Sequence, residues 1–477
     1  MDLRAIAADV PDFSAYPTFD ELTASTRELA AEFPHLVRVR TVGSSSSGDD
    51  IECLTIGDGS RSAVVYAVPN SNEPIGTLTI EYLARRLCED ASLRAELDFT
   101  WHFVKAVDPD GLRLNEAWLK PPITLTKYHR HFFREAMAEE ADLNFPIRYK
   151  TLAFDRPPPE TRALMSVIDD AEPDFCYALH NAEIGGTFYY VSHECGPIHA
   201  VLQEVPSWFG LHLSTEPATN PGDVLLAPGI SLVSSVTGIY DFLADNGVPD
   251  PATTAVLAGH GGLISDYLRR YRTFCLLPEV SPFDDPRSCD PAPSSLTRRE
   301  VLAACVEVLA ASATLAERFA EFEQDLRLDT RLHRAVRHTL EMYGFMAAQQ
   351  RDALAAIEDG DELATVAEWH RIILFRGTMQ RLRGMYVRML DLDLAAHPPG
   401  EAAARLAGHR EEAAAEFEAE AARLERDVPE PPPIRSAVGT QVCAGLAAAE
   451  YVRDHQPRRK PRRHRAGGRA CPGGTMM

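Results

Sequence analysis

The chain has 477 residues, of which 45% are hydrophobic and 25% charged, a balance typical of a soluble globular protein with two or three domains. It contains no run of 18 apolar residues, so the sequence predicts no transmembrane helix and no membrane partner. The formal net charge is −22. Because an acidic body repels phosphate backbones, nucleic acid is excluded as a partner of the folded part.

The first part of the chain alternates predicted helices and strands. Residues 18–33 form an amphipathic helix, and residues 37–42 and 51–56 alternate in polarity like two antiparallel strands. A buried strand is predicted at 63–68, followed by a sharp turn and a helix. This alternation predicts a mixed parallel and antiparallel sheet covered by helices on both faces.

Polar residues follow three of the predicted strands. Asn70 and Glu73 lie on the turn after 63–68, His180 follows an apolar strand candidate, and Glu279 follows a third. In α/β sheets, ligands bind at the carboxyl ends of strands, which is where such turns lie. The sequence therefore indicates a candidate site at this edge of the sheet.

The rest of the chain divides by composition. Residues 112–158 are rich in Pro, Tyr, His and Arg with little periodicity, which indicates a long functional loop region. From about residue 294 to 455 the pattern is purely helical. Residues 456–477 contain many Arg and Lys residues and no Asp or Glu, and we expect a disordered basic tail.

Five motifs follow one another along the chain: Asn70-x-x-Glu73, Asp108-Pro-Asp-Gly111, His129-Arg130-His131-Phe132, His180 and Glu279. Taken in this order, they resemble the zinc carboxypeptidase family over about residues 20–290. The resemblance implies a catalytic α/β domain at 1–290, with the helical segment 294–455 and the tail 456–477 appended to it.

The same resemblance implies a zinc site. Glu73 and His180 match two of the family's ligands, and Asn70 stands where the family has its first zinc-binding His. Because an amide oxygen is a weak, hard ligand for zinc, His129 and His131 remain open as substitutes for the third ligand. Glu279 matches the general base of the family.

Residues for substrate binding are also implied. Arg130 matches the Arg that binds the substrate's terminal carboxylate, and His129 flanks it. The family's second Arg falls near Leu119, which leaves Arg113 or Lys120 as its replacement. Tyr267 and Tyr240 are both open as counterparts of the family's active-site Tyr.

These residues lead to two hypotheses about function. The first is a zinc-dependent hydrolase that cleaves an amide or peptide bond, with a peptide or acylated amino acid as substrate. The alternative is a catalytically inactive carboxypeptidase-like protein that binds a peptide or a partner protein. Nine scattered cysteines and an N-terminus without a basic, apolar leader predict a cytoplasmic location.

Overall fold

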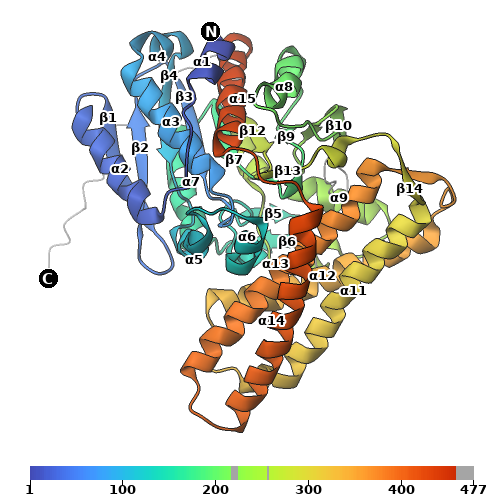
Figure 1. Ribbon diagram of the computed structural model, residues 1–477. Helices are drawn as coiled ribbons and strands as arrows, with labels where there is room; N and C mark the ends of the chain where they lie inside the picture. Colours follow the sequence, from blue (N-terminus) through green and yellow to red (C-terminus); the bar gives the residue numbers. More distant parts are fainter. Residues whose placement is uncertain (216–223, 255–256, 458–477) are drawn as a thin grey trace, which may run out of the picture.

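A nine-stranded mixed sheet forms the centre of the computed structural model, which describes residues 1–215, 224–254 and 257–457 (Figure 1). The strand order is β1-β2-β4-β3-β7-β12-β9-β11-β10. The strands are β1 (Val37–Ser44), β2 (Asp50–Ile56), β3 (Arg61–Ala67), β4 (Phe99–Val104), β7 (Phe175–Leu179), β9 (Phe188–Val191), β10 (Val224–Ala227), β11 (Ile230–Leu232) and β12 (Phe274–Glu279). The central strands β4, β3, β7 and β12 are parallel, and β1 pairs antiparallel with β2 as the sequence predicts.

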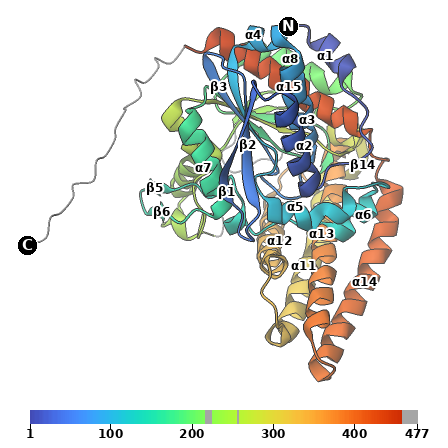
Figure 2. The same cartoon turned by 90° about the vertical axis from the view of Figure 1, so that its left-hand side faces the viewer.

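Helices cover both faces of the sheet. Alternate residues of β3 enter different cores, with Val65 and Ala67 in one cluster and Val64 and Tyr66 in the other. Figure 2 shows α7 (Pro159–Ala171) on one side of the sheet and α2 (Phe19–Glu32) and α3 (Ile75–Glu89) on the other. The predicted fold class, a mixed sheet flanked by helices and followed by an all-α segment, is therefore confirmed.

Short elements complete this α/β part. The helices are α1 (Leu3–Asp9), α4 (Ala91–Leu97), α5 (Pro109–Asn115), α6 (Leu125–His131), α8 (Gly196–Trp208), α9 (Val236–Asp245) and α10 (Ile264–Leu268). The short strands pair two by two, β5 (Ile147–Tyr149) with β6 (Leu152–Phe154), β8 (Ile184–Gly185) with β13 (Phe283–Asp284), and β14 (Pro293–Thr297) with β15 (Leu363–Thr365). Among the described residues, no helix is long and apolar enough to cross a membrane.

Four long helices form the helical region, which extends away from the sheet in both views (Figures 1 and 2). They are α11 (Arg298–Phe322), α12 (Arg331–Ala356), α13 (Val366–Ala396) and α14 (Glu401–Asp427). These helices pack on one another, and α13 and α14 also contact α6 of the α/β part.

The last helix, α15 (Ile434–His455), packs against α3 and α8 rather than against the helical region. It falls within the segment 294–455 that the sequence assigns to a separate appendage. The limits 1–290 and 294–455 remain a prediction, and most of the predicted tail 456–477 lies outside the described residues.

Candidate functional site

Asn70 and Glu73 lie on the tight turn between β3 and α3, and both side chains are buried. The backbone N–H of Glu73 donates to the carbonyl of Asn70 at 3.0 Å. Gly76, in the first turn of α3, allows this helix to approach the end of β7. A Cβ at Gly76 would lie 2.6 Å from the Cβ of Leu179, the residue before His180. The glycine therefore brings the turn next to His180.

The structure brings together the three residues that the resemblance assigns to zinc. His180 Nδ1 lies 3.1 Å from Glu73 Oε2, and Asn70 Nδ2 lies 2.9 Å from Glu73 Oε1. Asn70 Nδ2 is also 3.2 Å from His180 Nδ1. The three side chains thus form a compact buried cluster at the carboxyl ends of β3 and β7.

Two further residues fix His180 in this cluster. The Nε2 atom of His180 lies 3.0 Å from Oδ2 of the buried Asp142, and its carbonyl accepts a hydrogen bond from Gln441 Nε2 at 2.9 Å. Burial by itself would lower the pKa of His180, but Asp142 and Glu73 outweigh burial and hold the pKa well above its usual value. Asp142 therefore orients the imidazole, whose Nδ1 atom points at the carboxylate of Glu73.

Arg134 forms an ion pair with Glu73. Its Nη1 donates to Glu73 Oε1 at 3.2 Å, while Nε and Nη2 both lie 3.2 Å from Glu140 Oε1. The Arg134 side chain is 33% exposed, whereas those of Glu73 and Glu140 are 3% and 5% exposed. Arg134 therefore connects the buried carboxylates of the site to solvent.

Glu279, at the end of β12, lies beside His180, with which it forms a parallel backbone bridge. Burial raises the pKa of Glu279 to about 7, and Glu73 adds to the shift, while His180 and Arg134 oppose it. A carboxyl with a pKa in this range can both accept and return a proton near neutral pH.

The donor atoms can be tested against the zinc ion that the resemblance implies. Ligand atoms at about 2.0–2.2 Å from a tetrahedral ion lie about 3.3–3.6 Å from one another, which is close to the separations of 2.9–3.2 Å in this cluster. The hydrogen bond from His180 Nε2 to a carboxylate is also typical of a metal-binding histidine.

Asn70 limits this fit. The amide directs its nitrogen at Glu73 and His180, and its Oδ1 is buried with no hydrogen-bond partner among the described residues. A half-turn of the amide would exchange the two atoms and present Oδ1 as the third donor. In the part of the chain that the structure describes, no three His, Cys, Asp or Glu side chains could hold a metal ion, so a third protein ligand depends on this amide. On that condition, the cluster fits a metal with one nitrogen and two oxygen ligands.

The residues expected to bind substrate are engaged elsewhere. Arg130 forms a two-point ion pair with Glu418 of α14, at 2.5 and 3.0 Å. The Nε and Nη2 atoms of Arg113 donate to the carboxylate of Asp49 at 2.7 and 3.1 Å. His129 is buried against α13, and burial lowers its pKa to about 3. The guanidinium expected to hold a substrate carboxylate therefore already holds one from the protein.

The remaining open candidates also have partners. Lys120 Nζ forms an ion pair with Glu21 at 2.5 Å. Tyr267 donates to Asp169 at 2.7 Å, and the hydroxyl of Tyr240 lies 2.8 Å from that of Thr151. His131 lines a pocket between α6 and the helical region. The hydrogen bonds of the Asn70–Glu73–His180 cluster include none of these side chains.

Sequence reasoning missed Asp142, Arg134 and Gln441. The first two lie in the segment 112–158, which its composition marks as a functional loop but whose lack of periodicity gives no position for any side chain. Gln441 lies 261 residues after His180, on a helix that the sequence assigns to the appendage.

The fold and the cluster together define a mixed α/β protein with a buried polar site at the carboxyl edge of its central sheet. Residues 22–205 match the model of the zinc carboxypeptidase family. The matched segment contains Asn70, Glu73, Asp142 and His180.

Solved structures of carboxypeptidases are similar to the chain at low identity. Carboxypeptidase A from Helicoverpa armigera is 17% identical over 59% of this chain and 70% of its own, with a TM-score of 0.36. A metallo-carboxypeptidase from Burkholderia cenocepacia is 15% identical over 56% of this chain and 60% of its own, with a TM-score of 0.36. Murein-tripeptide amidase MpaA from Escherichia coli O157 is 16% identical over 57% of this chain and 90% of its own, with a TM-score of 0.27.

Proposed function

We propose that the protein is a hydrolase of the metallocarboxypeptidase type that cleaves an amide or peptide bond in a peptide or an acylated amino acid. The observation that carries the proposal is the convergence of Asn70, Glu73 and His180 at 2.9–3.2 Å, with Glu279 on the adjacent strand end. The family match over residues 22–205 supports the same reading.

Each residue of the site would have a separate role in this reaction. Asp142 accepts from His180 Nε2 and so keeps Nδ1 directed at Glu73, where Nδ1, the Glu73 carboxylate and Asn70 Oδ1 would hold zinc. When bound, zinc activates water and polarises a carbonyl. Glu279 would accept a proton from the attacking water on its carboxylate and return it to the leaving nitrogen. Arg134 restrains Glu73 from the solvent side.

Metal analysis and hydrolysis of N-acyl amino acids and short peptides, on the same preparation, test this function. We expect the purified protein to bind one zinc ion per chain and to hydrolyse at least one probe. Glu279→Gln should retain the metal, because Glu279 is not one of the proposed zinc ligands. Its rate should fall about 10²–10⁴-fold, because the substitution removes the proton acceptor. A Glu279→Gln protein that is as active as the native chain would contradict this mechanism.

A second candidate function is binding without catalysis. It is favoured by the amide nitrogen that Asn70 presents to the cluster and by the hydrogen bond from Arg134 to Glu73, since both occupy ligand atoms without a metal. Arg130 is also paired with Glu418, so a substrate carboxylate would first have to displace that carboxylate. Absence of both zinc and hydrolysis in the native protein would favour this function, with a peptide or a partner protein as the ligand.

We also propose a reducing, cytoplasmic location. All eight cysteines among the described residues are free thiols. Free thiols, most of them buried, are typical of proteins that fold in a reducing compartment.

A further inference from the structure

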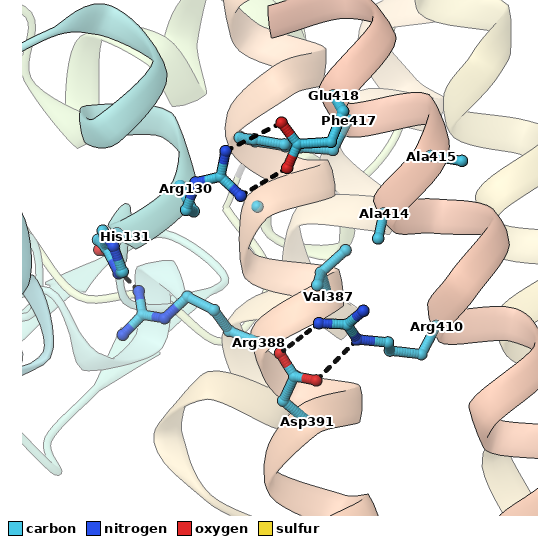
Figure 3. A pocket seen from close by; sticks show the side chains of 11 residues that line it. Arg130, His131, Val387, Arg388, Asp391, Arg410, Ala414, Ala415, Phe417 and Glu418 are labelled. Atoms are coloured by element: carbon cyan, nitrogen blue, oxygen red, sulfur yellow. Dashed lines mark hydrogen bonds and ion pairs between the residues drawn. The ribbon is translucent and has the colours of Figure 1, made fainter.

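A pocket of about 410 Å³ lies where α6 meets α13 and α14, apart from the Asn70–Glu73–His180 cluster (Figure 3). This volume is within the range of small-molecule sites. Arginines from all three helices, two acids and several apolar side chains line it. The side chains used below are Arg130, Val387, Arg388, Asp391, Arg410, Ala414, Phe417 and Glu418.

Two exposed ion pairs cross the pocket, as Figure 3 shows. Arg130 of α6 binds Glu418, and Arg410 binds Asp391 through Nε at 2.8 Å. The four side chains are 39–54% exposed. Exposed ion pairs stabilise a protein only weakly because water screens their charges, so a ligand that brings charges of its own can replace them.

Arg388 differs from these two arginines because it has no carboxylate partner among the described residues. Its Nη atoms donate to the carbonyls of His131, Phe132 and Leu114 at 2.7, 2.7 and 2.8 Å. Burial lowers the pKa of Arg388 to about 10, which reflects a desolvated cation that lacks a counter-ion. A ligand carboxylate would supply the missing negative charge.

The pocket also presents the opposite charge and an apolar surface. Asp391 and Glu418 can accept from an ammonium group, while Val387, Ala414 and Phe417 can contact a hydrocarbon side chain. A simple dianion would be repelled by the two carboxylates, whereas a zwitterion meets a partner for each of its charges.

We propose that this pocket is a binding site for a small zwitterion of the amino-acid class, either a free amino acid or a short peptide. The ligand carboxylate lies among the arginines, its α-ammonium group binds Asp391, and its side chain packs on Phe417 and Val387. The site goes beyond the proposed hydrolysis and does not depend on it.

Isothermal titration calorimetry of the full chain with three probes tests the proposal. L-Leucine carries both charges, N-acetyl-L-leucine only the negative charge, and L-leucinamide only the positive one. We expect saturable binding of L-leucine, with both derivatives at least about tenfold weaker. Asp391→Asn should weaken L-leucine at least about tenfold and leave N-acetyl-L-leucine no weaker, because only the ammonium partner is removed.

Controls separate loss of the site from loss of the fold. Arg405→Gln breaks another ion pair of α14, with Asp325, and should bind L-leucine like the native chain. Ala414→Trp should abolish binding by filling the pocket, whereas Ala404→Trp, on an exposed part of α14, should not. No binding of L-leucine, equal binding of N-acetyl-L-leucine, or binding that survives Ala414→Trp would overturn the proposal.

Discussion

At the scale of single residues, His180 lies between two buried carboxylates, Glu73 and Asp142. The contact with Asp142 orients the ring through Nε2. The other ring nitrogen, Nδ1, lies close to both Glu73 and the amide of Asn70. A bound zinc ion would replace the hydrogen bonds between these side chains. How tightly it binds therefore depends on how good a zinc ligand the side chain at position 70 is. An imidazole is a better zinc ligand than an amide oxygen, so this position can be tested directly.

Asn70→His should raise the affinity for zinc at least about tenfold, because it replaces a weak ligand and leaves Glu73 and His180 in place. The measurement is competition for zinc with a chelator of known affinity. Asn72→His, an equivalent change on the same turn at a residue that contacts Tyr128, serves as the matched control and should leave the affinity unchanged. Equal zinc affinity in the native and Asn70→His proteins would contradict a metal role for this cluster.

His102 of β4 makes stability depend on pH. Burial lowers the pKa of His102 to about 4, and Arg38 and Arg40 of β1 add to this, whereas Asp170 opposes it. The unfolded chain therefore binds more protons than the folded one between pH 6.5 and 4. Stability present above pH 6.5 is lost as the pH falls through this window, by up to about 3 kcal/mol.

His102→Gln should make this acid limb shallower, as measured by urea unfolding at a series of pH values. The exposed His35 provides the control, and His35→Gln should keep the slope of the native protein. The same slope in both variants would show that protonation of His102 does not contribute.

At the scale of elements, α6 and α13 approach so closely that only glycine fits between them. A Cβ at Gly384 would lie 2.0 Å from the carbonyl oxygen of His129, far inside van der Waals contact. Gly384→Ala should therefore push the two helices apart and destabilise the protein by about 1–3 kcal/mol or more. The shift of the urea midpoint measures this.

Gly408 of α14 gives the matched control, because a Cβ there meets no atom within 4 Å. Gly408→Ala should stabilise the protein by about 0.5–1 kcal/mol through helix propensity alone. A neutral effect of Gly384→Ala would mean that the contact between α6 and α13 is not maintained in solution.

Sequence periodicity could predict the elements in which the spacing of apolar residues within the element itself indicates its buried face. The strands 37–42 and 51–56 and the long helices after 294 have such patterns, and the structure contains them. The packing of α15 on α3 was not predictable. An apolar helix face indicates that the helix is buried, but it does not indicate which element it packs against. The contact that fixes it near the site, between Gln441 and the carbonyl of His180, joins residues 261 positions apart.

The same limit applies to the site. Glu73, His180 and Glu279 could be selected because each lies at or just after the carboxyl end of a predicted strand, and the strand order then brings them to the same edge of the sheet. Arg134 and Asp142 lie on irregular chain, whose path depends on the helices packed over it. Arg130 was expected to bind a substrate carboxylate. Its ion pair with Glu418 could not be predicted from the sequence, because the two residues are 288 positions apart.

At the scale of the whole molecule, Arg331 links the helical region to the α/β part. Its Nη atoms donate to both oxygens of Asp108 at 2.7 and 2.8 Å, and the side chains of Arg331 and Asp108 are 13% and 1% exposed. Asp108 also caps α5 by accepting from the backbone N–H of Gly111. Removing the guanidinium would leave a buried carboxylate without its counter-ion.

Arg331→Gln should therefore lower the free energy of unfolding by about 3–5 kcal/mol, measured by urea denaturation. Arg337→Gln, on the same helix but paired with the exposed Glu323 and Asp329, should cost no more than about 1 kcal/mol. The double variant Arg331→Gln/Asp108→Asn should recover part of the loss, since an asparagine can still cap α5 and carries no charge. If Arg331→Gln and Arg337→Gln proved equally mild, the link between the two parts would not depend on this ion pair, and the packing of α13 against α6 would have to hold them together.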